Sequence, residues 1–138
     1  MNTLYLIIGI PGSGKTTKAK EIISNYNKLN VPIKHFEADM FFEKNGKYIF
    51  NPKQLGLAHK WCQDKCRETM SNNIDVIISN TSLTPWERSG YIRMAQEFGY
   101  EVKVLTMTGN YQNVHGVPED KINAMKNKFV KFSENELK

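Results

Sequence analysis

The chain has 138 residues, enough for one domain with a real core but short for a nucleotide site plus a separate substrate domain. Its formal charge of +5, from 19 Lys and Arg against 14 Asp and Glu, favours polyanionic partners such as nucleic acid. No apolar segment approaches the roughly 20 residues of a membrane helix, and no charged leader with a cleavable apolar region is present. We therefore expect a soluble, cytoplasmic protein.

The first predicted element is a strand over residues 4–8, an apolar run typical of a parallel strand covered on both faces. It leads into GIPGSGKTT, whose spacing fits the phosphate-binding P-loop pattern G-x-x-x-x-G-K-[ST]. In this pattern Lys15 reaches the β and γ phosphates of a nucleotide, and Thr16 offers its hydroxyl to Mg²⁺. The predicted nucleotide-binding residues are Gly9, Pro11, Gly12, Ser13, Gly14, Lys15, Thr16 and Thr17.

A helix is predicted directly after this loop, over residues 16–26, because apolar residues recur there at helical spacing. This context disfavours the alternative, a glycine-rich turn with a chance lysine. A short strand over residues 33–37 follows, and Asn45-Gly46 then suggests an excursion or a tight hairpin. The remaining predictions are a helix over 52–71, a strand over 75–79, a helix over 85–98 opened by a capping box, a strand over 100–106, an irregular segment over 110–116 and a helix over 118–129.

The alternation of strands and helices predicts an α/β fold, a parallel four-stranded sheet with helices on both faces. Ligands of such sheets bind at the carboxyl ends of the strands. The loop over residues 9–17, Asp39 and residues 79–82 should therefore converge on one cleft. We expect a single domain over 1–138, comprising a core over 1–106, a short lid-like segment over 107–118 and a C-terminal helix.

Asp39 follows the second predicted strand and should face the γ phosphate across the cleft. A kinase that phosphorylates an alcohol needs a group that accepts its proton, and Asp39 is the candidate base; the alternative is a turn residue or helix cap. Many P-loop proteins place a metal-holding aspartate at the end of the third strand, where this chain has Ser79-Asn80. Asn80 or Thr81 is then a candidate to order metal-bound water or the acceptor, and Asn80 could instead form a turn.

Several aromatic residues lie near Asp39, and they either stack an acceptor base or form a satellite apolar cluster. They are Phe41, Phe42, Tyr48 and Phe50. His115 either contacts a phosphate or is structural, whereas His59 is interpreted as a hydrogen-bonded packing residue. Cys62 and Cys66 are too few for a zinc site or a disulfide framework and are predicted to be packing residues.

The ordered set "GIPGSGKTT", "FEADMFFEKNGKYIFNP", "AHKWC", "IISNTSLTPWE", "FGYEVKV" and "NVHGVPEDKINAMK" resembles the kinase domain of the Nedd-four-binding-protein-two-like proteins, relatives of bacteriophage 5′-polynucleotide kinase. The resemblance spans nearly the whole chain. It implies a P-loop NTPase fold and transfer of the γ phosphate of Mg-ATP to a nucleic-acid 5′-hydroxyl. Lys15 and Thr16 would bind the nucleotide, and Asp39 matches the family's general base.

The chain departs from that family at two positions that bind phosphate. The phage enzymes carry an arginine shortly after the aspartate, where this chain has Phe42, and lid arginines where the closest match is Gln112. Lys121, Lys126 and Lys128 are candidate substitutes, or simply belong to a solvated helix face. Such a cation can contribute orders of magnitude to the rate of phosphoryl transfer.

The sequence thus predicts an ATP-dependent, Mg²⁺-using kinase of the 5′-hydroxyl polynucleotide type. A kinase for a small alcohol, such as a nucleoside or nucleotide, is the first alternative, because closely similar folds serve those acceptors. The second is a nucleotide-binding regulatory or interaction module with weakened catalysis, favoured by the absent lid arginines but opposed by the retained Asp39.

Overall fold

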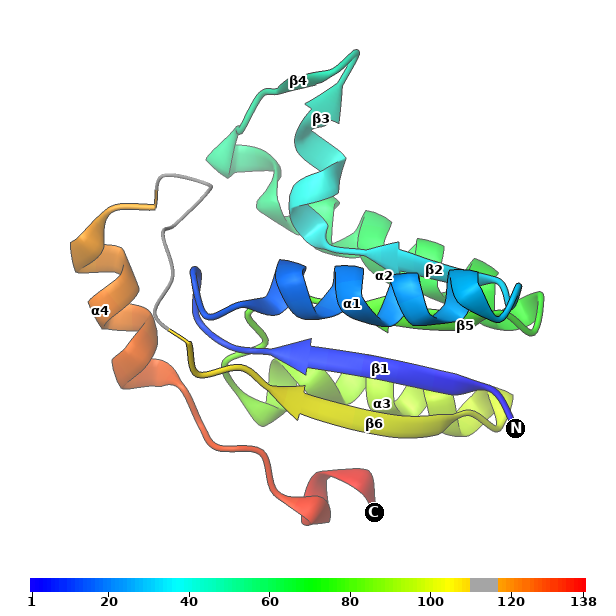
Figure 1. Cartoon of the computed structure of the whole chain (residues 1–138). Coiled ribbons are helices and arrows are strands. Elements are labelled where there is room, and N and C mark those ends of the chain that lie inside the picture. The colour runs from blue at the N-terminus through cyan, green and yellow to red at the C-terminus, as the bar shows by residue number, and fades with distance from the viewer. Residues whose placement is uncertain (110–116) are drawn as a thin grey trace.

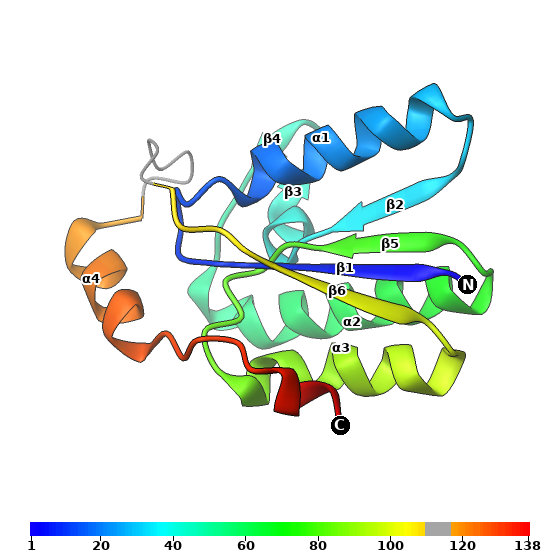
Figure 2. The same ribbon diagram turned by 60° about the horizontal axis from the view of Figure 1, so that its bottom comes forward.

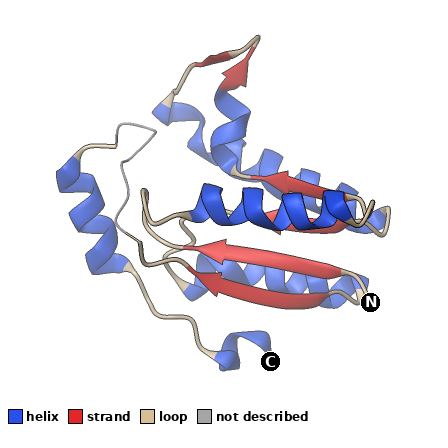
Figure 3. Ribbon diagram, viewed as in Figure 1, coloured by secondary structure: helices blue, strands red, loops and turns tan. Residues whose placement is uncertain are grey.

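The computed structural model describes residues 1–109 and 117–138 of the chain. Within these residues four parallel strands form a sheet in the order β2-β5-β1-β6 (Figure 1, Figure 3). Their bounds are β1 (Thr3–Ile8), β2 (Ile33–Phe36), β5 (Asp75–Ile78) and β6 (Glu101–Thr106). The predicted α/β fold with a four-stranded parallel sheet is confirmed, and all four strands end at the same edge.

Helices cover both faces of this sheet, with α1 on one side and α2 and α3 on the other (Figure 2). Their bounds are α1 (Lys15–Lys28), α2 (Leu55–Ser71) and α3 (Pro85–Phe98). Along β1, Ile7 packs against the α1 residues Ala19 and Ile22, whereas Leu4 and Leu6 pack in the cluster that holds α2 and α3. Because both of its faces are covered, β1 needs apolar residues at nearly every position.

The predicted hairpin is present and projects beyond the edge strand β2 (Figure 1). After the 3₁₀ helix η1 (Ala38–Phe42), strands β3 (Glu43–Lys44) and β4 (Lys47–Tyr48) pair antiparallel. Asn45 and Gly46 form the turn, both with positive φ, at 52° and 77°. Asn-Gly is the pair that such a turn favours, since both residues tolerate the left-handed region.

Local signals fix the ends of the helices close to where they are predicted. Thr84 Oγ1 accepts the Glu87 N–H at the start of α3, and Gly99 ends that helix in the left-handed conformation at φ 72°. The first turn of the predicted helix over 52–71 is instead a 3₁₀ helix, η2 (Pro52–Gln54), so α2 begins at Leu55. Both α2 cysteines are free and buried, which confirms their packing role, and burial raises the pKa of the Cys66 thiol to about 12.

The last elements are α4 (Glu119–Lys128) and the 3₁₀ helix η3 (Glu134–Leu137). Helix α4 lies beyond the carboxyl ends of β1 and β6, and the chain then returns alongside α3 (Figure 1). The predicted irregular segment, with Gln112 and His115, falls outside the described residues. Over the described ranges, no helix combines the length and apolar character needed to cross a membrane.

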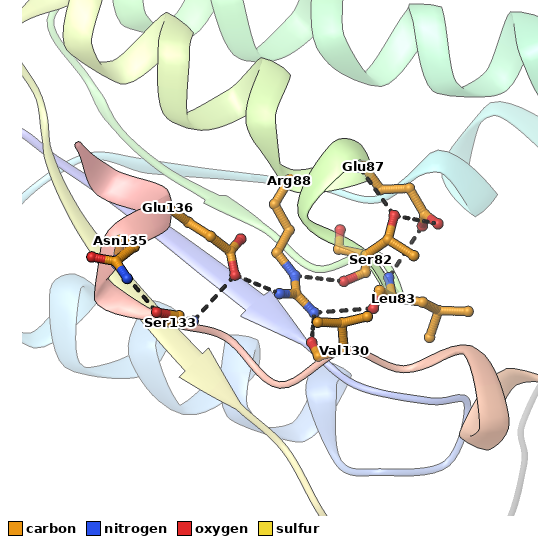
Figure 4. A network of polar contacts seen from close by, with 9 residues as sticks. Ser82, Leu83, Glu87, Arg88, Val130, Ser133, Asn135 and Glu136 are labelled. Carbon is orange, nitrogen blue, oxygen red and sulfur yellow. Dashed lines mark hydrogen bonds and ion pairs between the residues drawn. The ribbon is translucent and has the colours of Figure 1, made fainter.

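The returning tail is held by Arg88, whose side chain is completely buried (Figure 4). Its Nε donates to Ser82 O at 2.8 Å, and its Nη2 donates to the carbonyl oxygens of Leu83 and Val130. Its Nη1 pairs with Glu136 Oε2 at 2.9 Å. One arginine therefore joins the loop after β5 to the C-terminal tail.

Candidate functional site

The loop between β1 and α1 is shaped by close backbone approach. Gly9 has φ +152°, and a Cβ placed on it would lie 2.5 Å from Ser13 Oγ and 2.7 Å from Met107 O, so no larger residue fits. The Gly9 N–H donates to Thr81 O at 3.1 Å, which joins this loop to the loop after β5. Ser13 Oγ is buried and has no hydrogen-bond partner among the described residues, which suits a loop completed by a bound phosphate.

Lys15 lies in this loop at the start of α1. Its Nζ donates to the carbonyl oxygens of Gly9 and Ile10, both at 2.9 Å. Burial lowers the pKa of Lys15 to about 8, and the negative charges of Glu37 and Asp39 partly offset this effect. The charged ammonium is therefore partly desolvated, and a bound anion such as phosphate would stabilise it.

A cavity of about 520 Å³ opens at the carboxyl ends of the strands, a volume within the range of small-molecule sites. The three segments that the sequence predicts to converge all line it. It is lined by P-loop residues including Lys15 and Thr16, by Glu37 and Asp39 after β2, by Ser79, Asn80 and Thr81 after β5, by Tyr48 and Phe50, by Leu55 and His59, and by Lys121 and Met125 of α4.

Asp39 lies on η1 and is held from two sides. The Tyr48 hydroxyl donates to Asp39 Oδ1 at 3.1 Å, and the Ala38 N–H donates to Asn80 Oδ1 at 2.7 Å. Desolvation, and next the charge of Asp39, raises the pKa of Tyr48 to about 12, so that hydroxyl stays protonated and donates. Asn80 thus uses its oxygen to fix the backbone beside Asp39, a positioning role that the sequence alone does not reveal.

A second carboxylate, Glu37, lies in the same cavity, and no motif in the sequence identifies it. Ser79 Oγ donates to Glu37 Oε2 at 2.9 Å, and His35 Nε2 lies 2.6 Å from Ser79 Oγ. Burial lowers the pKa of His35 to about 4, so this imidazole is neutral at physiological pH. The only signal in the sequence is position, because Glu37 directly follows the last residue of β2.

The structure decides between the two alternatives for Phe42 and corrects the interpretation of His59. Phe42 is only 1% exposed and makes edge contacts with Phe41, Tyr48 and Phe50, so it belongs to the predicted apolar cluster and does not reach an acceptor. Tyr48 and Phe50 are 42% and 48% exposed and line the cavity, with rings stacked at 11° and centroids 6.5 Å apart. His59 is exposed and also lines the cavity, so its predicted packing role is wrong.

Helix α4 contributes a cation to the site. Lys121 lines the cavity, whereas Lys126 and Lys128 of the same helix do not. The other candidate from this part of the chain, His115, lies outside the described residues. Lys121 is therefore the described side chain best placed to substitute for a lid cation.

The oxygen groups in the cavity suit a metal that is shared with phosphates. Among residues 1–109 and 117–138, no group of three or more His, Cys, Asp or Glu side chains could hold a metal ion. Mg²⁺ usually keeps several waters and takes one or two carboxylates plus substrate phosphates. Thr16, Glu37 and Asp39 lie in one cavity with the phosphate loop and fit that pattern.

Known proteins resemble this chain in sequence and in fold. Human (Homo sapiens) NEDD4-binding protein 2 is 33% identical over an alignment of 139 positions, which covers 94% of this chain but only 8% of that protein. A chain of the Pnkp1/Rnl/Hen1 complex superposes with a TM-score of 0.62 at 18% identity, covering 99% of this chain and 43% of the other. A mutant of the Mycobacterium tuberculosis APS kinase CysC superposes with a TM-score of 0.63 at 11% identity, covering 92% of this chain and 96% of the other.

Most residues of the site lie in a region that matches a known domain family. The family model described as "AAA domain" matches residues 4–109, which include the phosphate loop, Asp39 and the loop after β5. The two structural matches share the fold of this chain, and at 18% and 11% identity they show similarity of fold only. The chain therefore belongs to the AAA domain family and has the P-loop NTPase fold.

Proposed function

We propose that this protein is an ATP-dependent 5′-hydroxyl polynucleotide kinase. The observation that carries the proposal is that Asp39 shares one cavity with Lys15 and the phosphate loop. A protein that only binds nucleotide needs no base there, whereas transfer to an alcohol needs a group that accepts its proton. The 33% identity to NEDD4-binding protein 2 and the fold shared with the Pnkp1 complex are in keeping with this reaction class.

Different residues of the cavity have different roles in the proposed reaction. Lys15, Thr16 and the N-terminus of α1 bind and orient the phosphates of ATP, where their positive charge stabilises the charge of the transferring group. Asp39, oriented by the Tyr48 hydroxyl, accepts the proton of the attacking 5′-hydroxyl. When Mg²⁺ is bound with the phosphates, it neutralises part of their charge.

Two features favour a nucleic-acid acceptor. Tyr48 and Phe50 present stacked, partly exposed rings at the edge of the cavity, and aromatic faces bind bases with little sequence preference. The net charge of +5 favours a polyanion. Of the aromatic residues predicted to stack an acceptor base, Tyr48 and Phe50 line the cavity, whereas Phe42 does not.

The test is transfer of labelled γ phosphate from Mg-ATP to 5′-hydroxyl DNA, 5′-hydroxyl RNA and free nucleosides. Labelling of an oligonucleotide, lost in a Lys15→Ala variant, supports the proposal and names the acceptor. Labelling confined to nucleosides would overturn it in favour of a small-alcohol kinase. Silence across the panel with ATP still bound would overturn it in favour of a nucleotide-binding module.

A kinase for a small alcohol is the second candidate, and the shape of the site is what favours it. Lys121 and Met125 of α4 line the cavity opposite the hairpin residues, so the site is bounded on several sides. Its volume of about 520 Å³ suits a nucleotide with a small acceptor. The similarity in fold to APS kinase is compatible with such a substrate.

The lowered pKa of Lys15 predicts a pH dependence of ATP binding. Its charged form binds the phosphates, and in the free protein that form is lost as pH rises through about 8. We expect the dissociation constant of ATP to be nearly constant below about pH 7, to about double by pH 8 and to rise about fivefold more between pH 8 and pH 9. Calorimetric titration at each pH measures it. Lys15→Arg, which stays charged throughout, should bind with no such rise; the same rise in this variant would contradict the assignment.

Lys121 is expected to contribute to transfer through its charge. It is exposed and lies at the edge of the cavity, so Lys121→Ala should lower the rate of phosphoryl transfer about fivefold, the effect of about 1 kcal/mol of screened attraction. Lys126→Ala removes the same charge from the same helix at a site outside the cavity and serves as the matched control. Equal losses in the two variants would show that only overall charge matters.

A further inference from the structure

The chain has Ser79-Asn80, and no carboxylate, at the end of β5. The neighbouring strand β2 places Glu37 at this position instead. β2 and β5 pair in parallel, with Phe36 opposite Ile78, and the Ser79 N–H donates to Phe36 O at 3.3 Å. This pairing sets Glu37 directly beside Ser79, with their side chains joined by a 2.9 Å hydrogen bond. Both residues line the cavity of the phosphate loop.

Hydrogen-bond accounting gives this contact a fixed direction. The Glu37 carboxylate only accepts, so the single hydroxyl proton of Ser79 goes to Glu37. Ser79 Oγ then accepts from the Nε2–H of His35, 2.6 Å away. His35 donates to Ser79 and Ser79 donates to Glu37, so the carboxylate is oriented by a chain of two hydrogen bonds anchored on β2 and β5. Carboxylates in metal sites are commonly oriented by such hydrogen bonds.

The charge of Glu37 matters when a nucleotide is bound. A carboxylate near bound phosphates would repel them, and a divalent cation between the two removes that repulsion. Asn80 cannot supply this charge, because its amide is neutral, and its Oδ1 accepts the Ala38 N–H at 2.7 Å. That bond instead fixes the backbone between Glu37 and Asp39.

We propose that Glu37 is the carboxylate that holds the water shell of the nucleotide-bound Mg²⁺, with Ser79 and His35 as its positioning residues. The inference rests on the proposed function only for the use of Mg-ATP, and it is independent of the acceptor. Glu37 belongs to the site described above but acts on the metal side, whereas Asp39 acts on the acceptor.

Calorimetric titration of the whole chain with ATP, once with Mg²⁺ and once with EDTA, tests this without any transfer step. The gain in ATP affinity on adding Mg²⁺ is the measured quantity. Glu37→Gln should lower this gain about tenfold, the lower end of what partners of a metal shell contribute. Its affinity for metal-free ATP should change less than the gain does, because the removed charge both repels the phosphates and raises the pKa of Lys15, two effects that oppose each other. Ser79→Ala should shift the gain in the same direction by less.

Glu68→Gln on α2 is the matched control, because Glu68 is exposed and pairs with Lys65 outside the cavity. It should keep the wild-type gain. Glu37→Asp keeps the charge and provides a second variant should Glu37→Gln fail to fold; its shorter arm should give an intermediate gain. A wild-type gain in either Glu37 variant, or no gain in the wild type, would overturn the inference. A reduced gain in Glu37→Gln, together with no labelling of any oligonucleotide by the wild type, would overturn the polynucleotide proposal alone.

Discussion

Substitution of Asp39 by Asn is expected to lower the rate of phosphoryl transfer by about 10²–10⁴-fold, the usual contribution of a positioned general base. Asn has the same shape and can still accept the Tyr48 hydroxyl, but it does not accept the proton of the acceptor alcohol. ATP should still bind, because the phosphate loop is unchanged and the pKa of Lys15 loses only the smallest of its three influences, the charge of Asp39. Single-turnover transfer of labelled phosphate, with ATP titrated in parallel, measures both quantities.

Two further variants separate the base from its surroundings. Tyr48→Phe keeps the ring and removes only the hydroxyl that donates to Asp39, so its effect should be small beside that of Asp39→Asn. Asp64→Asn removes an exposed carboxylate that pairs with Lys60 on α2 and should leave transfer unchanged. Wild-type rates in Asp39→Asn would remove Asp39 from the reaction and, with it, the main support for a kinase.

The segments around Asp39 show which parts of the site follow from sequence. The phosphate loop could be predicted because its glycines, lysine and flanking elements are adjacent in the chain, and Gly9 proves to be required by contacts of 2.5 and 2.7 Å. The position of Asp39 in the cavity could be predicted because it follows a short strand. Both predictions use local information, and the parallel sheet then brings the two segments together.

Residues that depend on the pairing of distant segments could not be identified in the same way. Glu37 matters because β2 lies beside β5, and no local pattern shows that Ser79 will donate to it. Phe42 and Phe50 are the same residue type, yet Phe42 packs in the core at the end of η1 and Phe50 lines the cavity after the hairpin. Lys121 requires the position of α4, which follows a segment outside the described residues.

Arg88 also depends on distant segments, and we expect its loss to destabilise the fold strongly. An arginine within an amphipathic helix is ordinarily solvent-facing, but here the guanidinium is fully buried against carbonyl oxygens and Glu136 (Figure 4). It also lies 5.5 Å from the centre of the Phe129 ring. Arg88→Met should lower the free energy of unfolding by about 3–5 kcal/mol, because a buried carboxylate and carbonyl groups lose their partner.

A thermal melt should show this loss as a fall in Tm of about 10 °C or more, given how melting temperature scales for domains of this size. Arg93→Met, an exposed arginine on the same helix, is the matched control and should change stability by less than about 0.5 kcal/mol. If Arg88→Met melted like Arg93→Met, the buried network would contribute nothing to folding.

The same network reaches the phosphate loop, so the Arg88 variant should also bind nucleotide less tightly below its melting temperature. Ser82, whose carbonyl accepts from Arg88, has φ +47°, a conformation that a non-glycine residue keeps only when its surroundings impose it. The preceding residue, Thr81, accepts the Gly9 N–H. Relaxation of Ser82 would move Thr81 away from Gly9. Combining Arg88→Met with Glu136→Leu removes both buried charges and should recover part of the stability, but Ser82 would still lack its donor and the affinity should stay low.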